Sequence, residues 1–180
     1  MSQRHNVFVS YHHANDQYYR NEFERLFAGF YDILIPKSVQ IGELDPYLSA
    51  ERIRQEIRDN YLRDSTVTVV LIGTETWGRK HVDWEIGSSI RQTQYNSRSG
   101  LLGILLPTHP DYYKSTYNEC TIPPRLSNNI NNGFAKIYKW STNAYEVKTW
   151  IHEAFLRRTS IIPDNSFQNF VNNRSGYGWC

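Results

Sequence analysis

Five short hydrophobic runs alternate along the chain with segments in which hydrophobic residues recur every three or four positions. The runs cover residues 7–11, 33–35, 66–72, 101–106 and 135–140. The third run has almost no polar residues apart from two threonines, which is typical of a strand buried on both faces of a parallel sheet. Strands that alternate with helices predict an α/β fold with a five-stranded parallel sheet and helices on both faces.

Four segments have the spacing of amphipathic helices. Asn15 or Asp16 is expected to cap the first helix, and Asn143, followed three residues later by Glu146, predicts a capping box at the start of the last one. The third helix is expected to begin near His81 or Val82. In the second helix, Ile53, Ile57 and Tyr61 share one face, so its charged residues are expected on a solvated surface; they are Glu51, Arg52, Arg54, Glu56 and Arg58.

The strand order follows from the degree of hydrophobicity of each run. If the third and fourth runs lie inside the sheet and the second lies at an edge, the order is 2-1-3-4-5, as in flavodoxin-like folds. In this order the direction in which strands are added reverses between the first and third strands, a position called the topological switch point. Ligands of such folds bind outside the carboxyl ends of these two strands. Two segments are therefore candidates for a site, residues 10–15 and residues 73–85.

Two regions do not fit the alternation of strands and helices. Residues 108–133 show no period and contain three prolines, which predicts a long functional or mobile connection, with a lid as one hypothesis. Residues 159–180 follow the last helix and contain four aromatic residues, so they are expected to pack on this chain or on a partner. We therefore expect a domain over residues 1–158 and a C-terminal extension over residues 159–180.

Composition and charge narrow the classes of function. The chain has 180 residues, enough for one sizeable domain, and a formal net charge of +2, which gives no strong field for nucleic acid or an anionic membrane. No apolar run approaches the length of a membrane helix, so a soluble, cytoplasmic protein is expected. Cys120 and Cys180 form no disulfide or zinc pattern and are expected to be ordinary thiols in a reducing compartment.

Among residues that could carry chemistry, Glu85 is the strongest candidate. His12 and His13 are adjacent and point in different directions, and no histidine pair has the spacing that places two metal ligands on one helical face, so no metal site is expected. Glu85 is expected in the first turn of the third helix, beside the switch point, where the helix dipole favours an ionised carboxylate at neutral pH. Acidic residues are also common in first turns simply because they stabilise helices.

Two segments resemble the motifs of a known family. Residues 7–11, a hydrophobic strand that ends in Ser-Tyr, resemble the first-strand box of TIR domains, with Asp16 as the acidic residue that follows. Residues 82–86, Val-Asp-Trp-Glu-Ile, resemble the tryptophan and glutamate box of TIR domains that cleave NAD, and more closely that of the TIR-like proteins of bacterial Thoeris anti-phage systems (ThsB). The resemblance covers about residues 6–158. It departs from the family at His81, where an aromatic residue is common.

The resemblance implies an enzyme that cleaves the bond between nicotinamide and ribose, with NAD as substrate and no bound cofactor. Its product would be a cyclic ADP-ribose isomer, a diffusible second messenger that activates the effector ThsA in bacterial immunity. Glu85 would be the catalytic residue, and the expected substrate-binding residues are Phe8, Ser10, Tyr11, His12, Lys37 and Trp84.

Purely structural roles for the same residues stay open. Large apolar residues such as Phe8 and Trp84 are usually buried for packing, and Lys37 can be a solvated charge. Two functions compete with the cyclase: a hydrolase that gives linear ADP-ribose, and a non-catalytic TIR adaptor that acts through self-association.

Overall fold

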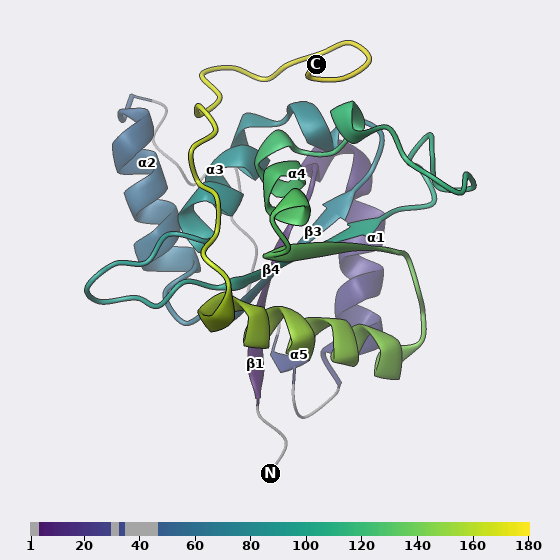
Figure 1. Ribbon diagram of the computed structural model, residues 1–180, viewed down its shortest axis with the longest axis horizontal. Coiled ribbons are helices and arrows are strands. Elements are labelled where there is room, and N and C mark those ends of the chain that lie inside the picture. The colour runs from purple at the N-terminus through teal and green to yellow at the C-terminus, as the bar shows by residue number, and fades with distance from the viewer. Residues whose placement is uncertain (1–3, 30–32, 35–46) are drawn as a thin grey trace.

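A parallel sheet forms the centre of the protein. The computed structural model describes residues 4–29, 33–34 and 47–180. The strands are β1 (His5–Ser10), β2 (Ile33–Leu34), β3 (Val67–Ile72), β4 (Gly100–Leu105) and β5 (Ala135–Lys139). Their order is β2-β1-β3-β4-β5 and every pair is parallel (Figure 1), as predicted. Four strands make the body of the sheet, whereas β2 contributes only two described residues at the edge, paired with His5 and Asn6.

Helices and short helical turns connect the strands. They are α1 (His13–Phe27), α2 (Ala50–Glu56), the π-helical turn η2 (Ile57–Tyr61), the 3-10 turn η3 (Thr76–Gly78), α3 (Lys80–Ser89), the 3-10 turn η4 (Glu119–Thr121), α4 (Pro124–Asn131) and α5 (Ala144–Ser160). The predicted α/β class with a helix-flanked parallel sheet is thus confirmed.

The predicted helix starts are partly right. Asn143 caps α5, because its side chain accepts a hydrogen bond from the Tyr145 backbone N–H at 3.1 Å, but Glu146 accepts from Ser141 and so does not complete a capping box. The prediction for α1 is wrong: the N-cap is His12, without a side-chain hydrogen bond, and Asp16 lies inside the helix. Asp16 is instead held in a buried contact described below.

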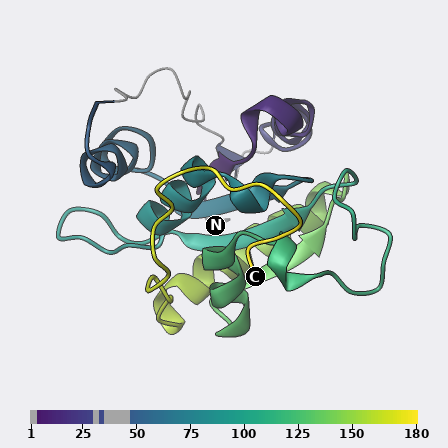
Figure 2. The same ribbon diagram turned by 90° about the horizontal axis from the view of Figure 1, so that it is seen from above.

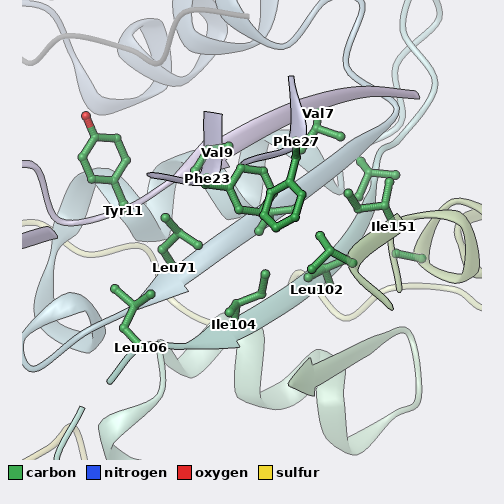
Figure 3. Packing of buried hydrophobic residues seen from close by; sticks show 14 residues of the cluster. Val7, Val9, Tyr11, Phe23, Phe27, Leu71, Leu102, Ile104, Leu106 and Ile151 are labelled. Atoms are coloured by element: carbon green, nitrogen blue, oxygen red, sulfur yellow. The ribbon is translucent and has the colours of Figure 1, made fainter. Parts of the chain in front are cut away.

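Each face of the sheet carries its own layer of hydrophobic packing. On one face α1 and α5 cover β1, β3 and β4, through side chains such as Phe23 and Ile151 against Val9 and Leu71 (Figure 3). On the other face α3 and α4 pack against β3 and β4. A third cluster joins Phe8 of β1 to α2, η2 and Trp84 of α3, so α2 lies beside α3.

One charged residue of the second helical segment is not on the surface. The helix changes from α to π at Ile57, where the Leu62 N–H donates to the Ile57 carbonyl at 3.1 Å. A π turn holds one more residue than an α turn, so it rotates the side chains that follow relative to a continuous α-helix. Arg58 is 3% exposed, and the prediction of a solvated Arg58 is therefore wrong.

The segment predicted to be an irregular connection contains regular structure. Within residues 108–133 lie η4 and α4, and α4 buries Leu126 and Asn129. The absence of a period was misleading because α4 is only eight residues long and rich in asparagine. Pro124 occupies the first helical position, where proline is favoured and where it signals a helix start.

The tail after α5 crosses to the other face of the sheet. It runs past α3 (Figure 1, yellow), and Figure 2 shows from above its last part, which contacts the start of α3 and η4. The fold brings Cys180 to Cys120, with Cα atoms 5.4 Å apart, and the two form a disulfide. The prediction of two ordinary thiols is therefore wrong, because a contact between residues 60 positions apart depends on the path of the tail.

None of the helices in the described ranges is long and apolar enough to cross a membrane.

Candidate functional site

Glu85 and Ser10 meet in a buried contact between α3 and the carboxyl end of β1. Ser10 is the last residue of β1 and Glu85 lies in the second turn of α3, and the Ser10 hydroxyl donates a short hydrogen bond to Glu85 Oε2. Ser10 is fully buried and Glu85 is 2% exposed. Glu85 forms no ion pair with an arginine in the described part of the chain. The carboxyl group therefore lies at the edge of the sheet where ligands of this fold class bind.

Burial sets the protonation of Glu85. Removal from water raises the pKa of its carboxyl from the ordinary 4.5 to about 8, and the hydrogen bond from Ser10 lowers it only in part. The expectation of an ionised Glu85 in the resting protein is thus wrong at neutral pH. The reason is burial, which the position on the helix did not reveal. In addition α3 begins at Lys80, one residue earlier than expected, so that Asp83 and not Glu85 is the acid in its first turn.

Phe8 and Trp84 flank this pair in one hydrophobic cluster. Phe8 is fully buried and Trp84 is 4% exposed, and both pack with Ile57 and Leu62. Residues 8 and 10 of β1 point to the same face of the sheet because successive strand residues alternate. The structure therefore brings Phe8, Ser10, Trp84 and Glu85 together.

The tail braces the other side of Trp84. The Trp84 indole N–H donates to the Phe170 carbonyl at 2.9 Å, and the Phe170 backbone N–H donates to Asp83 Oδ2 at 3.0 Å. Asp83 also forms a buried ion pair with Arg125 of α4, at 3.0 Å between Nε and Oδ1. Phe170 itself is 1% exposed. This network could not be predicted, because nothing in the sequence indicates where the tail packs.

Tyr11 and His12 are not brought to Glu85 in the same way. Tyr11 belongs to the hydrophobic cluster under α1 and α5 (Figure 3), stacks on His13 and donates from its hydroxyl to Gln17 at 2.7 Å. Its side chain thus serves the packing of the opposite face. His12 is mostly buried at the start of α1, and burial and the nearby Arg79 lower the pKa of its imidazole. Lys37 lies outside the described residues.

A second buried carboxyl group lies at the end of β3. Thr76 donates from its hydroxyl to Asp16 Oδ2 at 3.2 Å and accepts from the Gly73 N–H at 2.9 Å. A Cβ atom on Gly73 would lie 2.4 Å from Asp16 Oδ1, so only glycine permits this approach. Burial raises the pKa of Asp16 to about 6. The first-strand box already contained Asp16, but Thr76 carried no sequence signal.

Metal-binding groups do not gather in the described ranges. No three histidine, cysteine, aspartate or glutamate side chains of these ranges form a group that could hold a metal ion. The expectation of a site without a metal stays a prediction.

Comparison with known proteins supports the interpretation of the two motifs. No curated protein shows a significant match to the chain. The family model of the Thoeris protein ThsB, TIR-like domain, matches residues 8–111, which include residues 8–11 of the first box, the whole second box and the Ser10–Glu85 contact. This match covers more than half of the chain. The chain therefore belongs to the family of Thoeris ThsB TIR-like domains.

Proposed function

We propose that this protein is an NAD-processing enzyme of bacterial anti-phage defence, which cleaves the bond between nicotinamide and ribose and cyclises the remainder to a cyclic ADP-ribose isomer. The observation that carries the proposal is the buried Ser10–Glu85 pair at the carboxyl end of β1. A carboxyl group kept from water at the ligand-binding edge of a parallel sheet suits the stabilisation of a cation.

The chemistry requires a group that stabilises positive charge. When the C–N bond breaks, its electron pair leaves with nicotinamide, which becomes neutral, and the ribose becomes an oxocarbenium ion. A fixed carboxylate stabilises this ion electrostatically and accepts hydrogen bonds from the ribose hydroxyls. Glu85 has this role in the proposal, and Ser10 holds its carboxyl group in place.

The raised pKa of Glu85 fits this role once substrate is considered. In the free protein burial keeps the carboxyl group protonated near neutral pH. The nicotinamide ring of NAD carries a positive charge, and an opposite charge within a few ångström favours the ionised form. Substrate binding and ionisation of Glu85 would therefore promote each other, so that the carboxylate forms where the cation is.

Capture of the oxocarbenium ion decides the product. Attack by water gives linear ADP-ribose, and attack by a nucleophile of the same molecule gives a cyclic isomer; each nucleophile loses one proton after the new bond forms. Exclusion of water favours the cyclic product. Phe8 and Trp84, both nearly inaccessible to solvent, would exclude water beside Glu85. In the proposal Lys37 contacts a phosphate of NAD, and the product activates the effector ThsA.

The test is an assay of nicotinamide release. Purified protein and lysates of phage-challenged cells that express it are incubated with NAD, and nicotinamide is followed by chromatography. Glu85→Gln removes the charge with little change in shape, and we expect it to lose at least about 100-fold in rate, the effect typical of removing one electrostatic stabiliser. Glu153→Gln, a carboxylate of α5 on the opposite face of the sheet, is the matched control and should retain the wild-type rate.

The chemical identity of the product distinguishes the cyclase from the hydrolase. A cyclic isomer, identified by mass spectrometry and NMR, agrees with the proposal, whereas linear ADP-ribose alone indicates a hydrolase. If neither the purified protein nor the lysate of challenged cells releases nicotinamide above the level of Glu85→Gln, the protein is an adaptor and the proposal fails.

A further inference from the structure

A small polar cavity lies between α2, η2, the second half of α3 and the tail. Its volume is about 80 Å³. The lining residues are Arg54, Gln55, Arg58, Gly87, Ser88, Arg91, Arg125, Asn165 and Asn169. Four of these nine side chains are arginines and none is acidic. Neither of the TIR motifs accounts for this concentration of positive charge.

One of the four arginines is neutralised within the fold. Arg125 is 1% exposed and its guanidinium binds Asp83 through two nitrogens. It also donates to the side-chain oxygens of Asn165 and Asn169 at 2.6 and 3.0 Å. Arg125 is thus occupied, and it fixes two of the polar groups that line the cavity.

Two further arginines pair with the same exposed carboxylate. Arg54 and Arg91 both pair with Glu51, the latter at 3.3 Å, and the Glu51 side chain is 63% exposed. Ion pairs as exposed as this are weak, and their partners are readily drawn to another anion. The side chain of Arg91 is itself 55% exposed, so the cavity can be reached from solvent on this side.

Arg58 has no carboxylate partner in the part of the chain that the structure describes. Its two terminal nitrogens donate to the backbone carbonyls of Ser88 and Asn96, which carry no net charge, and its buried Nε has no hydrogen-bond partner among the described residues. The side chain is 3% exposed. A buried charge without a counter-charge is costly, and an anion in the cavity would remove that cost.

We propose that this cavity is a binding site for a small oxyanion of the phosphate type, held by Arg54, Arg58 and Arg91. Guanidinium groups bind phosphate oxygens through paired hydrogen bonds, and arginines from α2, η2 and the end of α3 suit an anion with oxygens in several directions. The cavity is too small for a whole nucleotide, which needs several hundred Å³. The ligand is therefore free phosphate or the terminal phosphate group of a larger molecule.

An anion here would strengthen the contact between the tail and α3. Asn165, which lines the cavity, donates to the Gly87 carbonyl at 3.0 Å, so the wall of the site includes both the tail and the helix. A ligand that binds only the folded state raises the free energy of unfolding by mass action. Thermal stability is thus a direct measure of binding, and it requires neither NAD nor catalytic activity.

The test compares sodium phosphate with sodium chloride at equal ionic strength and pH. We expect phosphate to raise the melting temperature in a saturable manner, by on the order of a few °C, with a dissociation constant confirmed by calorimetry. Arg91→Gln should weaken phosphate binding about tenfold or more, the loss expected for one charge-assisted hydrogen bond. Ribose 5-phosphate as a second ligand distinguishes the sources: it binds if the site takes a terminal phosphate group and does not bind if only free phosphate fits.

Arg25→Gln is the matched control for Arg91→Gln. Arg25 is also an exposed arginine paired with one glutamate, Glu22, but it lies on α1. Arg58→Gln should abolish binding; circular dichroism checks its fold, and Arg91→Gln decides the question if Arg58→Gln does not fold. The proposal is overturned if chloride produces the same stabilisation as phosphate, or if Arg91→Gln and Arg25→Gln bind phosphate with equal affinity.

Discussion

Burial gives Glu85 a protonation state that the sequence does not reveal. The motif Val-Asp-Trp-Glu-Ile singled out the residue, and the Ser10–Glu85 contact joins the two segments expected to form the site. Its pKa depends on the burial of the carboxyl group, which is a property of the folded chain. The position of Glu85 could thus be predicted from the local sequence, but its protonation state could not.

The pH dependence of stability provides a test of this protonation state. Below about pH 4.5 Glu85 is protonated in both folded and unfolded chains; between 4.5 and about 8 only the unfolded chain loses the proton, so the free energy of unfolding falls as the pH rises. Glu85→Gln cannot lose this proton. We therefore expect the variant to be more stable than the wild type at pH 8, by about 4 kcal/mol, and this advantage to shrink towards pH 5.

Urea unfolding at several pH values measures the difference. Asp16 has a raised pKa as well, but it is present in both proteins and so cancels in the comparison. Glu153→Gln should follow the wild type at every pH. Parallel curves for Glu85→Gln and the wild type would show that Glu85 ionises normally in the folded protein.

At the scale of elements, α3 is the helix on which the site depends. Successive residues on it face different neighbours: Asp83 binds Arg125 of α4, Trp84 binds the tail and Glu85 binds Ser10 of β1. The orientation of Glu85 is therefore fixed by contacts on several sides of one helix. The hydrophobic spacing of α3 predicted its existence, but its neighbours could not be predicted, since α4 has only eight residues and the tail forms no helix or strand.

Breaking the Asp83–Arg125 pair should be costly. Arg125→Gln leaves Asp83 buried without its counter-charge, and we expect the free energy of unfolding to fall by about 3 to 5 kcal/mol. Asp83→Asn combined with Arg125→Gln removes both charges and should recover part of this loss. Equilibrium unfolding in urea measures both, and Arg25→Gln, which breaks an exposed pair, should leave the free energy of unfolding nearly unchanged. A loss equally small in Arg125→Gln would contradict the role assigned to the buried pair.

At the scale of the whole molecule, the tail links parts that are far apart in sequence. It leaves α5 on one face of the sheet, buries Phe170 beside α3 on the other, and ends at η4, where the Trp179 indole donates to the Ile122 carbonyl at 2.8 Å. Its aromatic residues predicted that it packs, and Phe170 and Trp179 do so. Its path could not be predicted, because its hydrogen bonds to the segments before α5 join residues 30 or more positions apart.

The disulfide between Cys120 and Cys180 attaches the end of the tail to the segment that contains η4. The bridge encloses 60 residues and restricts the unfolded chain, so its removal by Cys180→Ser should lower the free energy of unfolding by about 4 kcal/mol or less. Cys120→Ser should have the same effect, and a reducing agent should destabilise the wild type but neither variant. Because helices cover most of both faces of β3 and β4, hydrogen exchange should rise more in residues 161–180 than in these two strands. Wild-type protein that is equally stable with and without reducing agent would show that the bridge does not hold the tail in place.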